Sequence, residues 1–254
     1  MKNTAGWLLA ALLVGGATAG AAEFWEKKKY IQWSETDVHK MLTDSPWARQ
    51  HIEAEVHIDP LEAPPVPGGA PTGDSDIGLR AREQNPRLTY QFQIRSALPI
   101  RQALVRRAQL QQGYDRLPAE EKQTLDQQAG QFLAKEFPDQ VVIHVSFESN
   151  IDFDQRELAR HWQTQTTEKL RNTVYLIGAK GVKAQLQEFV LADGSGQAFQ
   201  FTFPRTVEGQ ALAAPQDKEL QLEFIHPDIR GRGEKRVLVK FKINKMMVDS
   251  QLEY

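Results

Sequence analysis

The chain has 254 residues, 41% of them hydrophobic and 25% charged, with a formal net charge of −2. This length and apolar content suit one large domain or two small ones with an ample core. The near-neutral charge argues against general affinity for nucleic acid or anionic membranes. Because the chain has no cysteine, it has no disulfide, thiol nucleophile or cysteine metal site.

Residues 1–22 have the pattern of a secretory signal peptide. Lys2 gives a positive start, residues 7–14 form an apolar run, and Ala19-Gly20-Ala21 fits a small-residue cleavage site. The alternative, a retained membrane anchor, is opposed by the three lysines at 27–29, because positive charge favours the cytoplasmic side. We therefore expect a secreted or periplasmic chain, residues 23–254, with no membrane span after signal removal.

Residues 33–58 predict a short helix followed by a strand. Ser34 is a helix N-cap whose partner is Asp37 three residues on, and Pro46 ends the helix near residue 44. After Arg49 the period changes to two, with Ile52, Ala54, Val56 and Ile58 on one face and His51, Glu53, Glu55 and His57 on the other. We expect the isoleucine face to be buried and the histidine face to be wet.

Trp33 and Trp47 flank this helix. We expect them to clamp it onto a sheet, and an aromatic binding platform is the alternative. The pattern W-S-E-x-D-V-x-K-M-L-x-D-S-P-W-A at residues 33–48 resembles the opening motif of an uncharacterised family of secreted bacterial proteins. A weaker resemblance extends to residues 201–205 and the C-terminal strands. The resemblance implies secretion but brings no activity, ligand or catalytic residue.

The rest of the chain alternates strands with a few helices. Residues 59–86 are rich in proline and glycine, which indicates a mobile loop or linker. Strands are expected at 87–97, 140–148, 173–177, 182–191, 197–203, 220–225, 237–248 and 251–254. A helical hairpin insertion is expected at 98–137, and a further helix is expected with Asp154 as its cap, Glu157 as the reciprocal partner and Phe153 and Leu158 as the staple.

These elements predict a single strand-dominated α+β domain at 23–254. Because glycine-rich turns such as those at 178–181 and 193–196 link neighbouring strands as hairpins, we expect an antiparallel β-sandwich or curved sheet. The helical hairpin and two further helices would be attached to it.

None of the sequence motifs indicates a catalytic, cofactor or metal site. The Asn150-x-Asp152-x-Asp154 pattern lacks the glycine and glutamate that a calcium loop requires. Ser195 lies in a strand-to-strand turn rather than a nucleophile elbow. His144 fits a core histidine, while His226 and Asp228 share a loop where acid–base cooperation is conceivable. We expect no cofactor.

Two basic zones, 80–116 and 230–245, form the last candidate feature. If the fold joined them, they would make a cationic surface for an anionic envelope polymer or acidic partner; the alternative is solvated faces balanced by acids elsewhere. The candidate ligand surface therefore comprises Trp33, Trp47, Arg95, Arg101, Arg106, Arg230 and Arg232.

We predict a secreted non-catalytic domain that binds an unknown protein or polymer of the cell envelope. One alternative is a hydrolase whose site the fold assembles from groups such as Glu148, Asp152 and His226. The other alternative is binding of an anionic polymer through the basic zones.

Overall fold

Two antiparallel sheets form the body of the computed structural model, which describes residues 23–54, 86–231 and 233–254. The larger sheet has the order β1 (Ala48–Ala54), β2 (Arg87–Ile94), β3 (Gln140–Ser149), β7 (Ala198–Pro204), β6 (Glu188–Leu191). The smaller sheet has the order β11 (Lys235–Lys242), β10 (Glu219–His226), β4 (Tyr175–Ile177), β5 (Lys183–Gln185). The predicted strand-rich α+β class is confirmed. The predicted signal peptide (1–22) lies outside the described residues, as does the proline-rich loop (59–86) except for Pro86.

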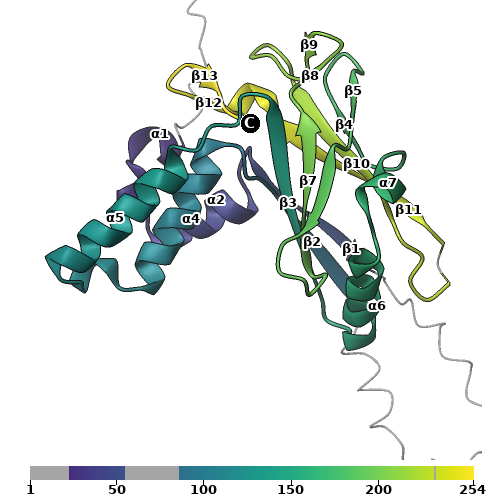
Figure 1. Cartoon of the computed structure of the whole chain (residues 1–254), viewed down its shortest axis with the longest axis horizontal. Helices are drawn as coiled ribbons and strands as arrows, with labels where there is room; N and C mark the ends of the chain where they lie inside the picture. The colour runs from purple at the N-terminus through teal and green to yellow at the C-terminus, as the bar shows by residue number, and fades with distance from the viewer. Residues whose placement is uncertain (1–22, 55–85, 232) are drawn as a thin grey trace, which may run out of the picture.

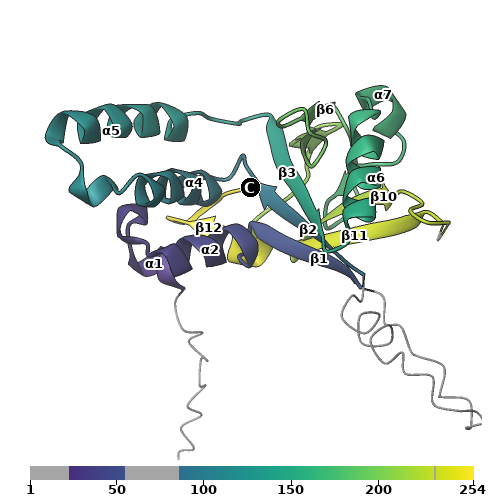
Figure 2. The same ribbon diagram turned by 90° about the horizontal axis from the view of Figure 1, so that it is seen from below.

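The helices gather in two places around the sheets. Helices α1 (Phe24–Lys27), α2 (Glu35–Thr43), α4 (Leu98–Gln111) and α5 (Ala119–Leu133) form a layer on one side, whereas α6 (Asp152–Gln163) and α7 (Thr167–Leu170) lie against the sheets (Figures 1 and 2). Short 3-10 turns are η1 (Tyr30–Gln32), η2 (Tyr114–Arg116) and η3 (Ile243–Lys245). Two small hairpins complete the fold, β8 (Thr206–Val207) with β9 (Gln210–Ala211) and β12 (Met247–Val248) with β13 (Gln251–Leu252).

One aromatic core lies between the inner faces of the two sheets. Tyr90 of β2 contacts Phe224 of β10 with ring centroids 5.5 Å apart. Trp162 of α6 enters the same core, 4.2 Å from Phe199 of the larger sheet and 6.1 Å from Phe224 of the smaller one. Because these side chains are fully buried, both sheets and α6 share the hydrophobic stabilisation that burial of large aromatic groups supplies.

The predicted helix after Trp33 forms with the predicted cap. Ser34 Oγ accepts from the Asp37 backbone N–H at 3.1 Å, and the Asp37 carboxylate accepts from the Ser34 N–H at 3.0 Å. This reciprocal pair satisfies two backbone donors that a helix start otherwise leaves open. Its apolar stripe, Val38, Met41 and Leu42, is buried as the spacing predicts.

The helical hairpin insertion is also confirmed, as α4 and α5 between β2 and β3. Gly113, with φ of 64°, lets the chain turn after α4. The buried Arg101 of α4 donates to the carbonyl oxygens of Leu133 at 2.6 Å and Lys135 at 2.5 Å, at the C-terminal end of α5. A guanidinium thus satisfies carbonyls that the last turn of a helix cannot pair itself.

The prediction that the isoleucine face of β1 is buried and the histidine face is in water is wrong. Its register pairs His51 with Tyr90 and Ile52 with Thr89, so His51 and Glu53 lie on the inner side and are half-buried, while Ile52 is 43% exposed. Alternation fixes which residues share a face but not which face meets the core. Here the inner polar residues find hydrogen-bond partners, so their partial burial is tolerated.

The predicted strand 182–191 is divided between the two sheets. Lys183–Gln185 pairs with β4, whereas Glu188–Leu191 pairs with β7. Between them Leu186 is buried, and Gln187 N–H donates to the Thr202 carbonyl at 2.9 Å. The chain therefore turns a corner from one sheet to the other, as strands of packed sheets commonly do.

The predicted cap of α6 is wrong. The helix begins at Asp152 with Ile151 as N-cap, so Asp154 lies inside the first turn and Phe153 is 47% exposed instead of packing as a staple. The Asp154 carboxylate accepts instead from Arg230 Nε at 2.5 Å. An acid in the first turn keeps the favourable interaction with the helix dipole while its oxygen binds the guanidinium.

Candidate functional site

The two tryptophans of the predicted ligand surface are buried. Trp33 is 1% exposed and Trp47 is fully buried. Their indole N–H groups donate to backbone carbonyls, Trp33 to Lys28 at 3.2 Å and Trp47 to Glu253 at 2.6 Å. They clamp the N-terminal helices to the sheet, and neither offers the exposed ring that an aromatic platform requires.

Three of the five arginines of that predicted surface bind other groups of the chain, two of them in the interior. Arg101 caps α5, and Arg106 Nε donates to the Trp33 carbonyl at 2.9 Å. Arg230 binds Asp154 and lies 5.5 Å from the Phe153 ring centroid. Arg232 lies outside the described residues. Among the six of these residues that the structure describes, Arg95 is the one whose side chain has no hydrogen bond or ion pair with another described residue.

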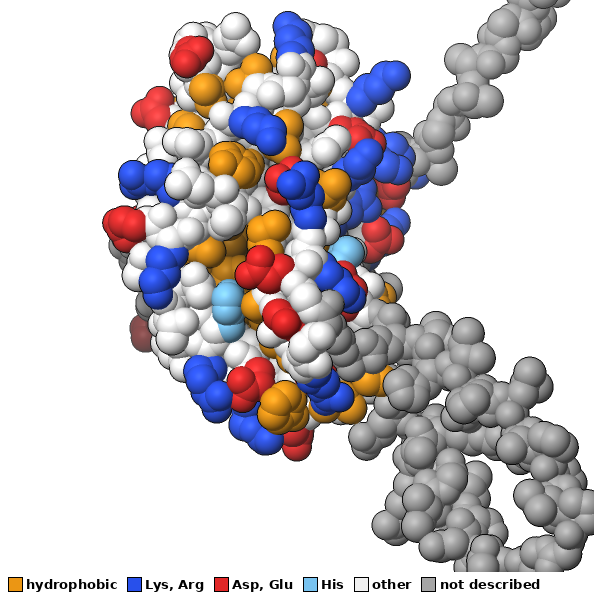
Figure 3. All heavy atoms as spheres, turned by 90° about the vertical axis from the view of Figure 1, so that its right-hand side faces the viewer, with side chains coloured by type: hydrophobic (Ala, Val, Ile, Leu, Met, Phe, Trp, Pro, Cys, Tyr) orange, Lys and Arg blue, Asp and Glu red, His pale blue; other side chains and the backbone are white. Residues whose placement is uncertain are grey.

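The second basic zone is balanced by acids on neighbouring strands. Lys235 pairs with Glu53 at 3.4 Å, Arg236 with Glu223 at 3.8 Å and Lys240 with Glu219 at 2.9 Å. Figure 3 shows blue and red side chains interspersed over the face that carries β11. A face with both signs interspersed creates little field for long-range attraction of an anionic polymer.

The candidate hydrolase residues do not converge. Glu148 and Asp152 are exposed, whereas His226 is buried with 8% exposure. Asp228 is exposed too, so the His226–Asp228 loop pair is divided between interior and solvent. Ser195 is held in its turn, since Asp193 Oδ1 accepts from both its N–H at 2.9 Å and its hydroxyl at 2.6 Å. Gly196 completes this turn with φ of 77°, and a β-carbon there would collide with the Ala159 carbonyl of α6.

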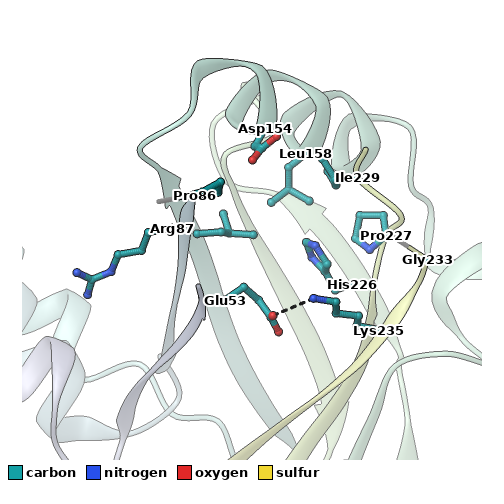
Figure 4. Close-up of a pocket in the computed structure, with 11 residues that line it drawn as sticks. Glu53, Pro86, Arg87, Asp154, Leu158, His226, Pro227, Ile229, Gly233 and Lys235 are labelled. Carbon is teal, nitrogen blue, oxygen red and sulfur yellow. Dashed lines mark hydrogen bonds and ion pairs between the residues drawn. The ribbon is translucent and has the colours of Figure 1, made fainter. Parts of the chain in front are cut away.

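One group of titratable side chains surrounds a small, partly open pocket at one end of the sheets (Figure 4). His226 lies between Leu158 of α6 and Lys235 of β11, with Glu53 of β1 facing Lys235. His226 Nδ1 and the Tyr90 hydroxyl are 2.8 Å apart. Burial lowers the pKa of His226 to about 4 and raises the pKa of Tyr90 far above its usual value. Both partners are therefore neutral at pH 7.

Glu53 is the charged centre of this pocket. One carboxylate oxygen lies 2.8 Å from His51 Nε2 and the other 3.4 Å from Lys235 Nζ. Burial acts to raise the pKa of Glu53, but the His51 hydrogen bond and the Lys235 charge outweigh it, so the pKa lies below its usual value. The sequence reasoning missed Glu53 because it placed this face of β1 in water. The alternation of the sequence did contain a signal, because it places His51 and Glu53 on the same face of the strand.

The volume of this pocket limits what it can do. It encloses about 50 Å³, which is room for a few water molecules at roughly 10–15 Å³ each. Small-molecule sites usually enclose about 300–1,000 Å³. The pocket therefore has acid–base groups without space for a substrate.

A larger cleft lies on the outer face of the five-stranded sheet. It encloses about 500 Å³ between α2, α4 and strands β2 and β3, on the side where the helical hairpin diverges from the sheets (Figure 1). Its polar lining is made of amides, hydroxyls, one histidine and two charged groups: Gln91, Gln93, Gln111, Thr43, Ser146, His39, Glu35 and Arg107. The chemistry of this lining suits hydrogen bonding to a polar ligand.

Two glutamines of β2 sit in this cleft with fixed orientations. Gln91 Nε2 and Gln93 Nε2 both donate to the Leu42 carbonyl in the last turn of α2, at 2.8 and 2.9 Å. Their amide oxygens consequently have no hydrogen-bond partner within the described residues. Gln93 is 6% exposed, so its unpaired oxygen is a desolvated acceptor, which costs free energy unless a partner arrives.

Arg95 and His144 lie on the same sheet face as the lining residue Gln93, although neither lines the cleft itself. His144 pairs in register with Gln93, and Arg95 follows Gln93 by two residues. Burial, then the positive charge of Arg107, lowers the pKa of Arg95 to about 10. Burial, then Arg95 and Arg107, lowers the pKa of His144 to about 4. This corner thus combines two arginines with a neutral histidine.

Within the described ranges, no group of three or more histidine, aspartate or glutamate residues could hold a metal ion. No helix in the same ranges is long and apolar enough to cross a bilayer. No protein-family model, curated protein or solved structure matches this chain. The family resemblance of residues 33–48 therefore stays a prediction.

Proposed function

We propose that this chain is a secreted or periplasmic, non-catalytic binding domain that recognises a protein or polymer of the cell envelope. The observation that carries this proposal is the contrast between the two hollows. The open cleft of about 500 Å³ is lined mainly by amides and hydroxyls, with Arg107, Glu35 and His39, whereas His226 and Glu53 line only about 50 Å³. The larger polar space therefore lies away from His226 and Glu53.

The rival hydrolase needs a nucleophile or activated water beside a base, with room for a substrate. The Tyr90–His226 pair is buried and neutral, and the pKa of His226 is lowered to about 4. A base of that pKa is weak at neutral pH, where catalysis works best with a pKa near the operating pH. The cleft supports binding through the amides and hydroxyls of its lining.

Crosslinked capture from the native envelope, followed by identification of the partner, tests the proposal. The mature chain 23–254 is compared with Gln111→Tyr, which places a ring at an exposed lining position of the cleft. Gln128→Tyr on the exposed surface of α5 is the matched control. We expect one reproducible partner that binds the purified wild type and the control and is lost with Gln111→Tyr.

Equal binding by all three proteins would contradict the assignment of the cleft. Turnover of an envelope substrate that disappears with His226→Gln would instead establish the hydrolase. A further protein lacking residues 60–86 tests the proline-rich segment, whose loss we expect to weaken capture if that segment takes part in binding.

A further inference from the structure

We propose that the cleft between α2, α4 and the five-stranded sheet binds the carboxylate of an acidic saccharide, with Arg107 of its lining and the adjacent Arg95 as its cationic partners. This inference rests on the proposed binding function and names the class of ligand. It is carried by the unpaired polar groups of the cleft and by the volume that they surround.

The positive charge of Arg95 lacks a partner. Arg95 is half-buried and its Nε is buried without a hydrogen-bond partner, whereas Arg107 is exposed, and neither forms an ion pair with a carboxylate of the described residues. Glu35 lines the α2 side of the cleft without pairing with either of them. Buried charges in proteins are normally paired, because removal from water is costly. A carboxylate seated here would supply the missing charge, and the planar guanidinium fork is suited to bind it through two hydrogen bonds.

The glutamines require hydrogen-bond donors. Because Leu42 holds their nitrogen atoms, Gln91 and Gln93 can offer a ligand only their oxygens. A bare oxyanion carries acceptors alone and would leave both oxygens unpaired. Sugar hydroxyl groups are donors and acceptors at once, so they can pair with these oxygens while the amide nitrogens stay on Leu42. Thr43 and Ser146 add hydroxyl partners along the same lining.

The remaining groups fit an acidic sugar in size and charge. About 500 Å³ lies within the range of about 300–1,000 Å³ that small-ligand sites enclose. Since the pKa of His144 is lowered to about 4, His144 is neutral at pH 7 and acts as a hydrogen-bonding neighbour. The attraction for the carboxylate thus comes from the arginines.

Calorimetric titration of the mature chain with three probes tests this inference. The probes are glucuronate, which has a carboxylate and hydroxyls, glucose, which has only hydroxyls, and inorganic phosphate, which is an anion without sugar hydroxyls. We expect saturable glucuronate binding that weakens with added salt, and at least about tenfold weaker binding of glucose and phosphate, which corresponds to about 1.4 kcal/mol.

Variants then locate the site. We expect Arg95→Gln to weaken glucuronate binding at least about tenfold and Arg107→Gln several-fold, whereas Arg116→Gln, an exposed arginine of η2, leaves it unchanged. Arg95→Lys keeps the charge without the planar fork and should bind with intermediate affinity. Thermal unfolding of each variant confirms that a loss of binding is not a loss of the fold.

Unchanged binding by folded Arg95→Gln would overturn the assignment of Arg95. Phosphate binding as tight as glucuronate binding would overturn the saccharide and reduce the cleft to a simple anion site. If the wild type captures an envelope partner through the cleft but binds no glucuronate, this inference fails while the proposed function stands. If neither binding occurs, both fail.

Discussion

Two histidines, the half-buried His144 and the buried His226, tie the free energy of unfolding to pH. Burial lowers the pKa of each to about 4, whereas an unfolded histidine has a pKa of about 6.5. Between these values the unfolded chain binds more protons than the folded chain. Their stabilising contribution is therefore complete above about pH 6.5 and is lost as the pH falls towards 4.

We expect His226→Gln to flatten this acid dependence, because glutamine can still hydrogen-bond Tyr90 but does not titrate. Urea unfolding at several pH values measures the effect. Each histidine contributes at most about 1.4 kcal/mol for each pH unit between pH 6.5 and 4. The pKa of His226 also depends on the charges of nearby groups, which are Glu53, Lys235, His161 and His51. The variant His144→Gln, which removes the other histidine with a lowered pKa, serves as a comparison. Parallel pH profiles for the wild type and both variants would contradict the prediction.

At the scale of elements, the position of α5 depends on one side chain of α4. Arg101 is 6% exposed, donates to the Phe132, Leu133 and Lys135 carbonyls, and lies 5.4 Å from the Phe137 ring centroid. Hydrogen bonds from a charged donor stabilise more than neutral ones. The helical hairpin is therefore joined at its open end by a guanidinium as well as by apolar contact.

We expect Arg101→Ala to lower the free energy of unfolding by about 2–3 kcal/mol and to reduce the helical circular dichroism signal. Arg101→Lys should recover only part of the loss, because an ammonium cannot reproduce the fork. Arg116→Ala is the exposed control. A loss below about 0.5 kcal/mol for Arg101→Ala would show that α5 is held by its apolar contacts alone.

Local signals in the sequence predicted helices and strands well. They predicted less well which face of a strand is buried and which distant residues a side chain contacts. The cap of α2 and the α4–α5 hairpin follow from spacing within a few residues, so they were predictable. The facing of β1 and the use of Asp154 depend on Tyr90 and Arg230, which are distant in sequence. The cleft was harder still, because its unpaired atoms on Gln91, Gln93 and Arg95 are recognisable only once the helices cover the sheet.

At the scale of the whole molecule, Trp162 joins three parts of the fold. It lies fully buried between Phe199 and Phe201 of the larger sheet and Phe224 of the smaller one. A side chain shared by both sheets and α6 should make their unfolding cooperative, since none of the three can lose it alone.

We expect Trp162→Ala to lower the free energy of unfolding by about 3–5 kcal/mol, because the removed ring leaves a cavity that the sheets cannot close. Trp162→Phe should cost less. Near- and far-ultraviolet circular dichroism should lose signal in one transition in the wild type. Two separate transitions in the wild type would show that the sheets unfold independently.

Helix α5 differs from this core in one respect, since Ala129 is its one buried side chain. An element with so little buried apolar surface opens at a small fraction of the global unfolding free energy. Its backbone amides should exchange hydrogen for deuterium long before those of β3 or β7. A protease that cuts within α5 would then leave both sheets folded. The cleft beside α4 would also remain and could be studied without α5.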